Sequence, residues 1–225
     1  MTPSQLKFDA QGLVTVVVQD RLTGEIRMLA HADISALQAT LDTGEGHFYS
    51  RSRAAQWRKG ETSGHVLKVT EVWVDCDADA VLYLVDPQGP SCHTGRASCF
   101  FQPLSDAAQS AGELGHALPL LPRLWAELAS RKEAPVGSSY TRALLDDGPT
   151  KIGAKIREEA DELARALESE SDDRVLSEAA DELYHLLVGL LARGLQLRDL
   201  EAVLAQRQGL SGLAEKANRR PSHTV

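Results

Sequence analysis

The chain has 225 residues, 43% hydrophobic and 25% charged, which are fractions typical of folded globular proteins rather than disordered or collagen-like chains. With 24 basic and 32 acidic side chains its net charge is -8, which argues against a general binder of nucleic acid or anionic membranes. The start MTPSQLKFDAQG resembles neither a secretory signal nor an Arg-rich transit peptide, and the nearly apolar stretch 183–192 is too short to span a bilayer. We therefore expect a cytoplasmic protein without a membrane partner, although a local basic cluster could still hold a small anionic ligand.

The first part of the chain, residues 1–102, predicts an α+β domain with a mostly antiparallel sheet. Short runs rich in β-branched and aromatic residues alternate apolar with polar side chains, and turn residues such as Thr23-Gly24 separate them. A single helix is expected over 33–41. The predicted strands are 13–19, 25–30, 47–50, 65–75 and 80–85.

The remainder of the chain predicts an all-α helical bundle, joined to the first domain by a linker. Residues 103–121 are rich in Ala, Ser, Gly and Pro and show no steady hydrophobic period, which is typical of a linker. Helical periodicity then dominates the domain 122–207, and a flexible tail is expected over 208–225. The predicted helices are 120–131, 140–146, 151–168, 175–193 and 199–207.

The three cysteines of the chain all lie in its first hundred residues. Three thiolates would leave one position of a tetrahedral Zn²⁺ open for water, as in a catalytic site. The first cysteine belongs to the acidic segment DCDADA, whose carboxylate oxygens suit Mg²⁺. The spacing alone leaves an alternative open, namely a buried thiol, two incidental cysteines and a solvated acidic turn. The candidate ligands are Cys76, Cys92 and Cys99 for zinc and Asp75, Asp77 and Asp79 for magnesium.

Two basic segments, HFYSRSR (47–53) and WRKGETSGH (57–65), stand before the acidic segment. They place guanidinium and ammonium groups beside hydroxyl and glycine residues, and such groups can bind phosphate closely. An ordinary solvated basic turn is the alternative. The candidate phosphate-binding residues are Arg51, Arg53, Arg58, Lys59, Thr62 and Ser63.

Four motifs in this order, HFYSRSR, WRKGETSGH, DCDADA and GPSCHTGRASCF, closely resemble phosphoribosyl-AMP cyclohydrolase, an enzyme of histidine biosynthesis. The resemblance implies that the three cysteines bind zinc, with Cys76 from one subunit of a homodimer and the other two from its mate. It also implies that the aspartates bind magnesium and that the basic segments hold the two phosphates of the substrate.

The chemistry implied by this resemblance is hydrolytic opening of the adenine ring. A zinc-bound water would attack C6 of phosphoribosyl-AMP, and the N1–C6 bond would open. His93 is the candidate general base, with His65 as the second choice, and a structural role for His93 is the alternative. His31 departs from the family, which usually has an aromatic residue there, and this leaves the lining near the helix start undetermined.

Acidic residues of the helical half form two sets on neighbouring predicted helices. Each set shares one side of its helix, and an antiparallel hairpin would bring the sets together around Mg²⁺. A solvated acidic face is the alternative. A di-iron bundle is discounted, because Glu182-x-x-His185 is the single motif of that kind. The candidate ligands are Glu158, Glu159, Glu162, Glu178 and Asp181.

The motifs GSSYT (137–141), KIGAKIREEADE and EAADELYHLLVGLLARG resemble phosphoribosyl-ATP pyrophosphatase, an all-helical nucleotide pyrophosphohydrolase. The resemblance implies hydrolysis of phosphoribosyl-ATP to phosphoribosyl-AMP and pyrophosphate, with magnesium on the carboxylates and Glu159 as the candidate base. Lys151 and Lys155 would bind phosphate, unless they are surface lysines. The sequence thus predicts a bifunctional enzyme whose second half supplies the substrate of its first. A non-catalytic metal-binding or storage protein is the alternative.

Overall fold

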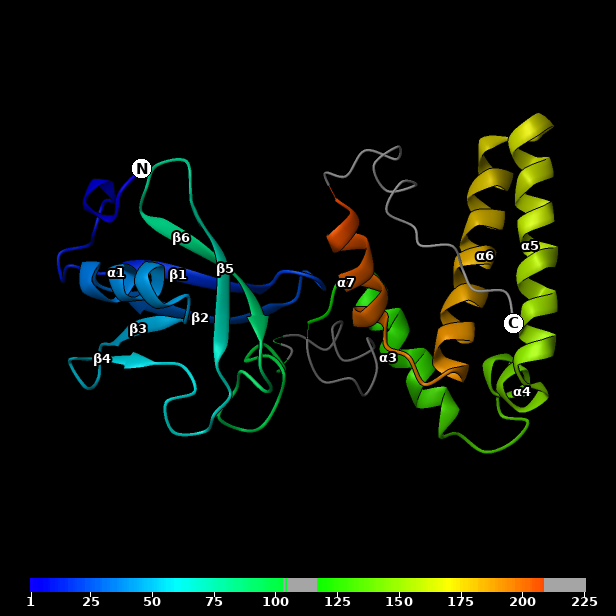
Figure 1. Cartoon of the computed structure of the whole chain (residues 1–225), viewed down its shortest axis with the longest axis horizontal. Helices are drawn as coiled ribbons and strands as arrows, with labels where there is room; N and C mark the ends of the chain where they lie inside the picture. Colours follow the sequence, from blue (N-terminus) through cyan, green and yellow to red (C-terminus); the bar gives the residue numbers. More distant parts are fainter. Residues whose placement is uncertain (103, 105–116, 209–225) are drawn as a thin grey trace, which may run out of the picture. The chain divides into compact units, whose positions relative to one another are not determined.

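The computed structural model describes residues 1–102, 104 and 117–208. It divides into two compact units, Met1–Leu120 and Leu121–Val225 (Figure 1). Most of the predicted linker 103–121 and of the predicted tail 208–225 lies outside the described residues. The predicted domain boundaries therefore stay predictions, and each unit is described by itself.

The first unit contains a six-stranded sheet with the order β4-β3-β2-β1-β6-β5. The sheet is mixed, so the prediction of a mostly antiparallel sheet is corrected: β1 and β6 run parallel, while the other neighbours are antiparallel. Alternating hydrophobicity cannot reveal this pairing, because it reports which face a strand buries and not which strand lies beside it. The strands are β1 (Val14–Asp20), β2 (Ile26–Ala32), β3 (His47–Ser50), β4 (Ala55–Arg58), β5 (Leu67–Val74) and β6 (Ala80–Pro87).

Strand β4 was not predicted from the sequence. Its four residues, AQWR, hold a single large apolar side chain and so carry no alternation that marks a strand. Pairing with β3 places Trp57 opposite Phe48, and the two rings lie 5.0 Å apart. The strand thus forms because a neighbouring edge offers hydrogen bonds and an aromatic contact.

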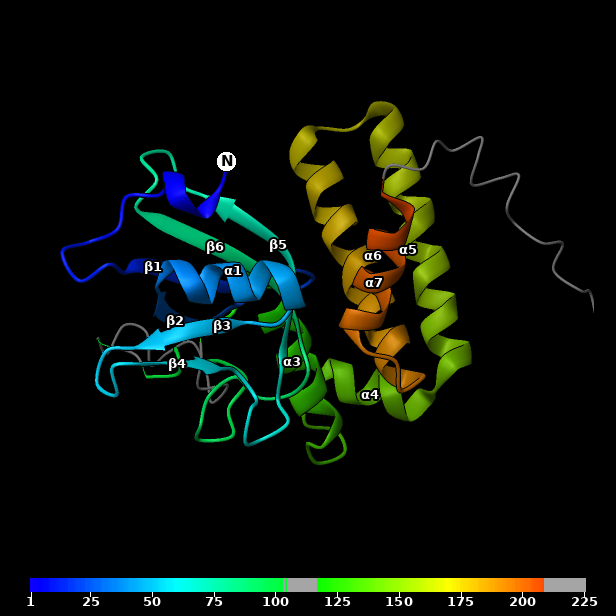
Figure 2. The same cartoon turned by 60° about the vertical axis from the view of Figure 1, so that its left-hand side comes forward.

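Helix α1 (Ile34–Thr43) covers one face of the sheet, and the core of the first unit lies between them (Figure 2). The Asp33 carboxylate accepts a hydrogen bond from the Ala36 N–H at the start of the helix, and Gly44 ends it in a left-handed conformation. Strand β1 buries every second residue, as expected for a half-buried strand. The buried cluster includes Val14, Val16, Val18, Leu37, Phe48 and Tyr83.

The second unit is helical, as predicted. Helices α5 and α6 form a long hairpin and lie side by side in both views (Figures 1 and 2). Ser171 begins α6 by accepting a hydrogen bond from the Arg174 N–H. Among the described residues, no helix is long and apolar enough to cross a membrane. The helices are α3 (Leu120–Lys132), α4 (Tyr140–Asp147), α5 (Pro149–Ser169), α6 (Asp172–Ala192) and α7 (Leu197–Arg207).

Candidate active sites

A cavity of about 550 Å³ lies at one end of the sheet, between the loop that follows β4 and the loop that follows β6. Both loops were marked by sequence motifs, and Figures 1 and 2 show them at the same end of the sheet. The cavity therefore joins the predicted phosphate-binding residues to two of the predicted zinc ligands. The predicted site residues that line it are Arg53, Arg58, Lys59, Thr62, Ser63, His65, Cys92, His93 and Cys99.

The loop that carries Cys92 and Cys99 is stabilised by hydrogen bonds within itself and to strand β2. The Cys92 N–H donates to the Arg96 carbonyl at 3.0 Å, and the Cys99 N–H donates to the Arg27 carbonyl at 2.9 Å. The Ser98 hydroxyl donates to another β2 carbonyl at 2.7 Å. Backbone hydrogen bonds of this kind set the positions of both thiols without using the thiols themselves.

A buried ion pair between Arg27 and Glu25, with a 2.7 Å contact, supports the same loop. The guanidinium also donates to the hydroxyl of Ser91, the residue before Cys92, at 3.1 Å and to the Gly89 carbonyl at 3.2 Å. Sequence reasoning missed this pair. The available signal was two charged side chains, at alternate positions, at the start of an otherwise apolar strand.

The two thiols of this cavity have different electrostatic surroundings. The Thr94 hydroxyl donates to Cys92 Sγ at 3.1 Å and lowers the pKa of that thiol, because the hydrogen bond stabilises the thiolate. Partial burial, and then the neighbouring Cys92, raise the pKa of Cys99 to about 11. Burial also lowers the pKa of Lys59, which lies close to both. The sulfurs of Cys92 and Cys99, with the cation of Lys59 nearby, fit two of the four ligands of a tetrahedral zinc site.

Cys76 does not join this pair within one chain. It lies exposed in the turn between β5 and β6, with Asp77 Oδ1 4.0 Å from its sulfur. Among the described residues, the groups of three or more metal-binding side chains with ligand atoms within 4.8 Å of one another contain no cysteine. The structure therefore brings two of the three predicted zinc ligands together and leaves the third apart.

The carboxylates of Asp75, Asp77 and Asp79 do come together, within 4.8 Å. The Asp75 carboxylate accepts hydrogen bonds from the N–H groups of Ala80 (3.1 Å) and Asp79 (3.0 Å), and the bond from Ala80 above all lowers its pKa. Repulsion from Asp77 and then Asp75 raises the pKa of Asp79. Exposed oxygen ligands that repel one another fit a hard cation such as Mg²⁺.

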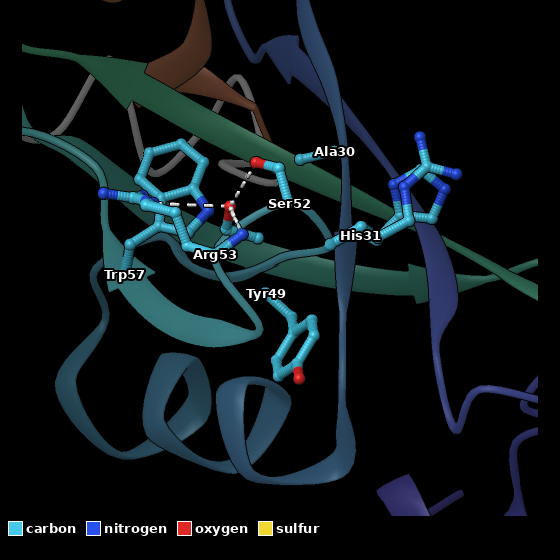
Figure 3. A pocket seen from close by; sticks show the side chains of 8 residues that line it. Ala30, His31, Tyr49, Ser52, Arg53 and Trp57 are labelled. Carbon is cyan, nitrogen blue, oxygen red and sulfur yellow. Dashed lines mark hydrogen bonds between the residues drawn. The ribbon is translucent and has the colours of Figure 1, made fainter.

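A second cavity, of about 430 Å³, adjoins the first and shares Arg53 and Trp57 with it. Figure 3 shows these two side chains at one side of the cavity and His31 at the other. Arg51 lines this second cavity and is absent from the lining of the first. Burial, followed by the charge of Arg51, lowers the pKa of His31. His31 thus lines the cavity close to Arg51 and opposite Arg53.

Arg53 and Arg58 each have a partner within the protein. Arg53 Nε donates to the Ser50 hydroxyl at 3.3 Å. Arg58 forms an ion pair with Glu45. Of the predicted phosphate ligands in the larger cavity, Arg58 is therefore engaged in an ion pair and Arg53 in a hydrogen bond within the protein.

The helical unit brings together Glu159 of α5 with Glu178 and Asp181 of α6, within 4.8 Å. Glu159 is 7% exposed and Glu178 3% exposed. Burial raises the pKa of Glu178 above its ordinary value, the nearby charge of Arg174 opposes this shift, and Glu162 adds to it. Asp181 is exposed, so the cluster has two buried members and one that is open to solvent. Such a carboxylate cluster fits Mg²⁺, which would offset the repulsion and the loss of hydration.

The other predicted residues of the helical unit surround this cluster. Lys155 Nζ lies 2.9 Å from Glu159 and 3.0 Å from Glu158, whose side chain is 56% exposed. Glu158 therefore faces solvent beside the cluster instead of entering it. Lys151 is also exposed. Arg174, which the sequence did not single out, forms an ion pair with Glu178.

Comparison with family models assigns one enzyme class to each unit. Residues 28–101 match the phosphoribosyl-AMP cyclohydrolase model. This range contains the larger cavity of the first unit, lined by Cys92 and Cys99 and called the thiol cavity below. Residues 121–208 match the phosphoribosyl-ATP pyrophosphohydrolase model, and this range contains the buried carboxylate cluster. The two classes are those predicted from the motifs.

Proteins with this combination match along almost the whole chain. A histidine biosynthesis bifunctional protein HisIE from Wolinella succinogenes is 42% identical, over 96% of this chain and 97% of its own. One from Deinococcus radiodurans is 43% identical, over 93% and 95%. A chloroplastic one from Arabidopsis thaliana is 40% identical, over 96% of this chain and 79% of its own.

The chain belongs to this family of bifunctional histidine-biosynthesis enzymes, which join a cyclohydrolase to a pyrophosphohydrolase. The prediction of a bifunctional hydrolase is confirmed, and it is supported over the storage-protein alternative.

Proposed function

We propose that the chain catalyses two consecutive hydrolyses. The helical unit, a bundle of the nucleotide pyrophosphohydrolase type, cleaves phosphoribosyl-ATP to phosphoribosyl-AMP and pyrophosphate. The first unit then opens the adenine ring of phosphoribosyl-AMP between N1 and C6. The observation that carries this proposal is that the thiol cavity and the buried carboxylate cluster lie in separate units, each within the matching family range. We place the enzyme in the cytoplasm, where its three free thiols stay reduced.

In the first unit, Cys92, Cys99 and the partner subunit's Cys76 would hold zinc, which supplies hydroxide at neutral pH when bound. The hydrogen bond from Thr94 favours the thiolate form of Cys92. His93, with His65 as the second candidate, takes the proton released during attack at C6, since both line the cavity.

The phosphates of the substrate bind on the basic side of the two cavities. Lys59 presents a cation beside two hydroxyl groups, and such a set holds phosphate by charge-assisted hydrogen bonds. The proposed magnesium ligands of this unit are Asp75, Asp77 and Asp79, and the proposed phosphate ligands are Arg51, Arg53, Arg58, Lys59, Thr62 and Ser63.

In the helical unit, the carboxylate cluster would hold magnesium, which neutralises the triphosphate when bound. Glu159 is the proposed base that takes the proton of the attacking water, because its carboxylate is buried and belongs to the cluster. Lys155, held beside Glu159, and Lys151 bind the phosphates. The proposed magnesium ligands are Glu159, Glu162, Glu178 and Asp181; Glu158, the fifth residue expected from the sequence, faces solvent beside them.

The direct test supplies phosphoribosyl-ATP to the full chain with Mg²⁺ and Zn²⁺. We expect release of pyrophosphate and formation of the ring-opened product. Removing zinc with a chelator should stop ring opening and leave pyrophosphate release, and added zinc should restore the second step. Absence of both products from the metal-loaded enzyme would overturn the proposal, and ring opening by verified zinc-free enzyme would exclude the zinc site.

The shared zinc site of the proposed homodimer has a test of its own, since each dimer would hold two sites related by twofold symmetry. Cys76→Ala and Cys92→Ala proteins, each inactive alone, are unfolded and refolded together. In a mixed dimer one site then collects both defects and the other collects none. With random pairing, recovery should reach roughly a quarter of wild-type cyclohydrolase activity. If verified mixed dimers show no recovery, the three cysteines come from one chain.

A further inference from the structure

Tyr140 is the first residue of α4 and belongs to the motif GSSYT, to which the proposed function assigns no role. Its side chain is 55% exposed although the helical unit has a buried core at hand. An exposed aromatic residue is unremarkable alone. Its surroundings, however, fix its ring beside the buried carboxylate cluster.

The Tyr140 hydroxyl is anchored by His185, which is 4% exposed. His185 Nδ1 lies 2.9 Å from the Asp181 carbonyl oxygen, so this nitrogen carries the proton and donates it. In the neutral ring Nε2 is then an acceptor, and the Tyr140 hydroxyl, 3.2 Å away, donates to it. The hydroxyl is therefore satisfied within the protein, and the free part of the side chain is its ring.

The ring plane of Tyr140 is set by two aromatic neighbours. It lies nearly parallel to Tyr184, with the centroids 6.3 Å apart and an angle of 15° between planes. The His185 ring meets it edge-on, at 87°. These contacts, together with the hydroxyl anchor, restrict the rotation of the Tyr140 side chain, so little conformational entropy remains to be lost on binding.

The same histidine connects Tyr140 to the proposed catalytic carboxylate. His185 Nδ1 lies 3.7 Å from Glu159 Oε1, and Lys155 Nζ lies 2.9 Å from the same oxygen. The ring of Tyr140 is thus one residue away from the group that would receive the reacting phosphates. In a nucleotide the base is joined to the phosphates through the ribose, so a nucleotide whose phosphates bind at the cluster carries its base close to the cluster.

We propose that Tyr140 is a further substrate-binding residue, whose open ring face stacks on the adenine base of the nucleotide. The proposal rests on the proposed pyrophosphohydrolase function. Stacking on a fixed aromatic ring suits a base, because every base has a π-face, and it adds affinity without touching the phosphates. Tyr140 would then distinguish a nucleotide from a simple polyphosphate.

The test measures pyrophosphate release from phosphoribosyl-ATP by the full chain, which reports on the helical unit alone. Tyr140→Leu should raise KM about tenfold, equivalent to about 1.4 kcal/mol, and leave kcat within about twofold. Tyr140→Phe keeps the ring and should recover most of this loss. Two inhibitors separate base from phosphate. The inhibition constant of AMP should rise about tenfold in Tyr140→Leu, while that of tripolyphosphate, which has no base, should change less than about twofold.

Trp73→Leu is the matched control, since Trp73 is an aromatic residue of similar exposure, 58%, in the other unit. It should alter neither inhibition constant. Equal weakening of AMP and tripolyphosphate by Tyr140→Leu, or an unchanged KM in a variant with wild-type circular dichroism, would overturn the stacking role alone. A wild-type chain that releases no pyrophosphate from phosphoribosyl-ATP would instead overturn the proposed function, and this inference with it.

Discussion

At the scale of single residues, Gly89 shows how tightly the residues around the cyclohydrolase cavity are packed. It has a φ of 107°, a conformation that side chains with a Cβ rarely adopt. A Cβ placed there would lie 2.4 Å from His65 Nδ1, which is far inside van der Waals contact. The same residue offers its carbonyl to Arg27 at 3.2 Å. Gly89 therefore leaves room for His65, a candidate proton acceptor. It also binds Arg27, which supports the loop that carries Cys92 and Cys99.

Gly89→Ala should lower kcat/KM for supplied phosphoribosyl-AMP by roughly tenfold to a hundredfold, because His65 must move. Backbone strain should also lower the free energy of unfolding by about 1 kcal/mol. Gly12→Ala is the control, since Gly12 also has a positive φ, of 74°, and open space around its Cβ position. It should show the strain and no loss of activity. Similar activity in both variants would contradict this account of His65.

Tyr83 predicts a pH dependence of stability. Complete burial raises its pKa from an ordinary 10.0 to about 12. The unfolded chain therefore releases this proton at lower pH than the folded one, so the contribution to stability is full below pH 10 and is lost as the pH rises to about 12. The loss should amount to about 2–3 kcal/mol in the free energy of unfolding.

Urea unfolding of wild type and of Tyr83→Phe, below pH 10 and near pH 12, measures this contribution. The phenylalanine cannot ionise, so the stability difference between the two proteins should shift in favour of Tyr83→Phe as the pH rises. All other groups titrate in both. A difference independent of pH would show that Tyr83 ionises normally in the folded state.

Strand β2, at the scale of elements, organises the thiol loop. Backbone carbonyls of this strand accept from Cys99 and Ser98, and its Arg27 side chain reaches Ser91 and Gly89. The Arg27–Glu25 pair is nearly enclosed, with side chains 9% and 5% exposed. Breaking a buried pair costs more than replacing both partners, because the remaining charge stays buried and unpaired.

Arg27→Met should lower the free energy of unfolding of the first unit by about 3–5 kcal/mol and reduce its zinc content. The double variant Glu25→Leu/Arg27→Met removes both charges and should regain most of the stability. Zinc content should stay low in the double variant, since the bonds to Ser91 and Gly89 are still missing. Denaturant unfolding and metal analysis measure both. Equal stability of the single and double variants would contradict the role of the pair.

The whole molecule places its two chemistries in separate compact units with separate cores. A change in the carboxylate cluster should therefore not reach the thiol cavity. Glu159→Gln or Asp181→Asn should reduce pyrophosphate release at least about a hundredfold, because the metal and the base are both disturbed. Turnover of supplied phosphoribosyl-AMP should stay within about twofold.

Glu168→Gln is the control for this experiment, as it neutralises an exposed carboxylate of the same helix outside the cluster. It should leave both activities unchanged. An equal fall of both activities in Glu159→Gln would show that the two units depend on each other.

Local patterns predicted most elements of the fold. The helix expected over 151–168 is found at Pro149–Ser169, and the one expected over 140–146 at Tyr140–Asp147. Strand β4 and the parallel pairing of β1 with β6 were missed. Periodicity records which residues face a core, whereas the order of strands depends on contacts between distant segments.

The sequence by itself determined the two enzyme classes, because four motifs in one half and three in the other each combine several reactive residue types. It also predicted that Glu159, Glu178 and Asp181 share one site, since i, i+3 and i+4 spacing gives each helix an acidic face and an antiparallel hairpin would bring the two faces together. The tertiary structure alone decided that Glu158 faces solvent, that Cys76 stays apart from Cys92 and Cys99, and that Arg27 and His185 support the two sites. Apart from the exposure of Glu158, these relations concern residues distant in the chain, and packing decides all of them.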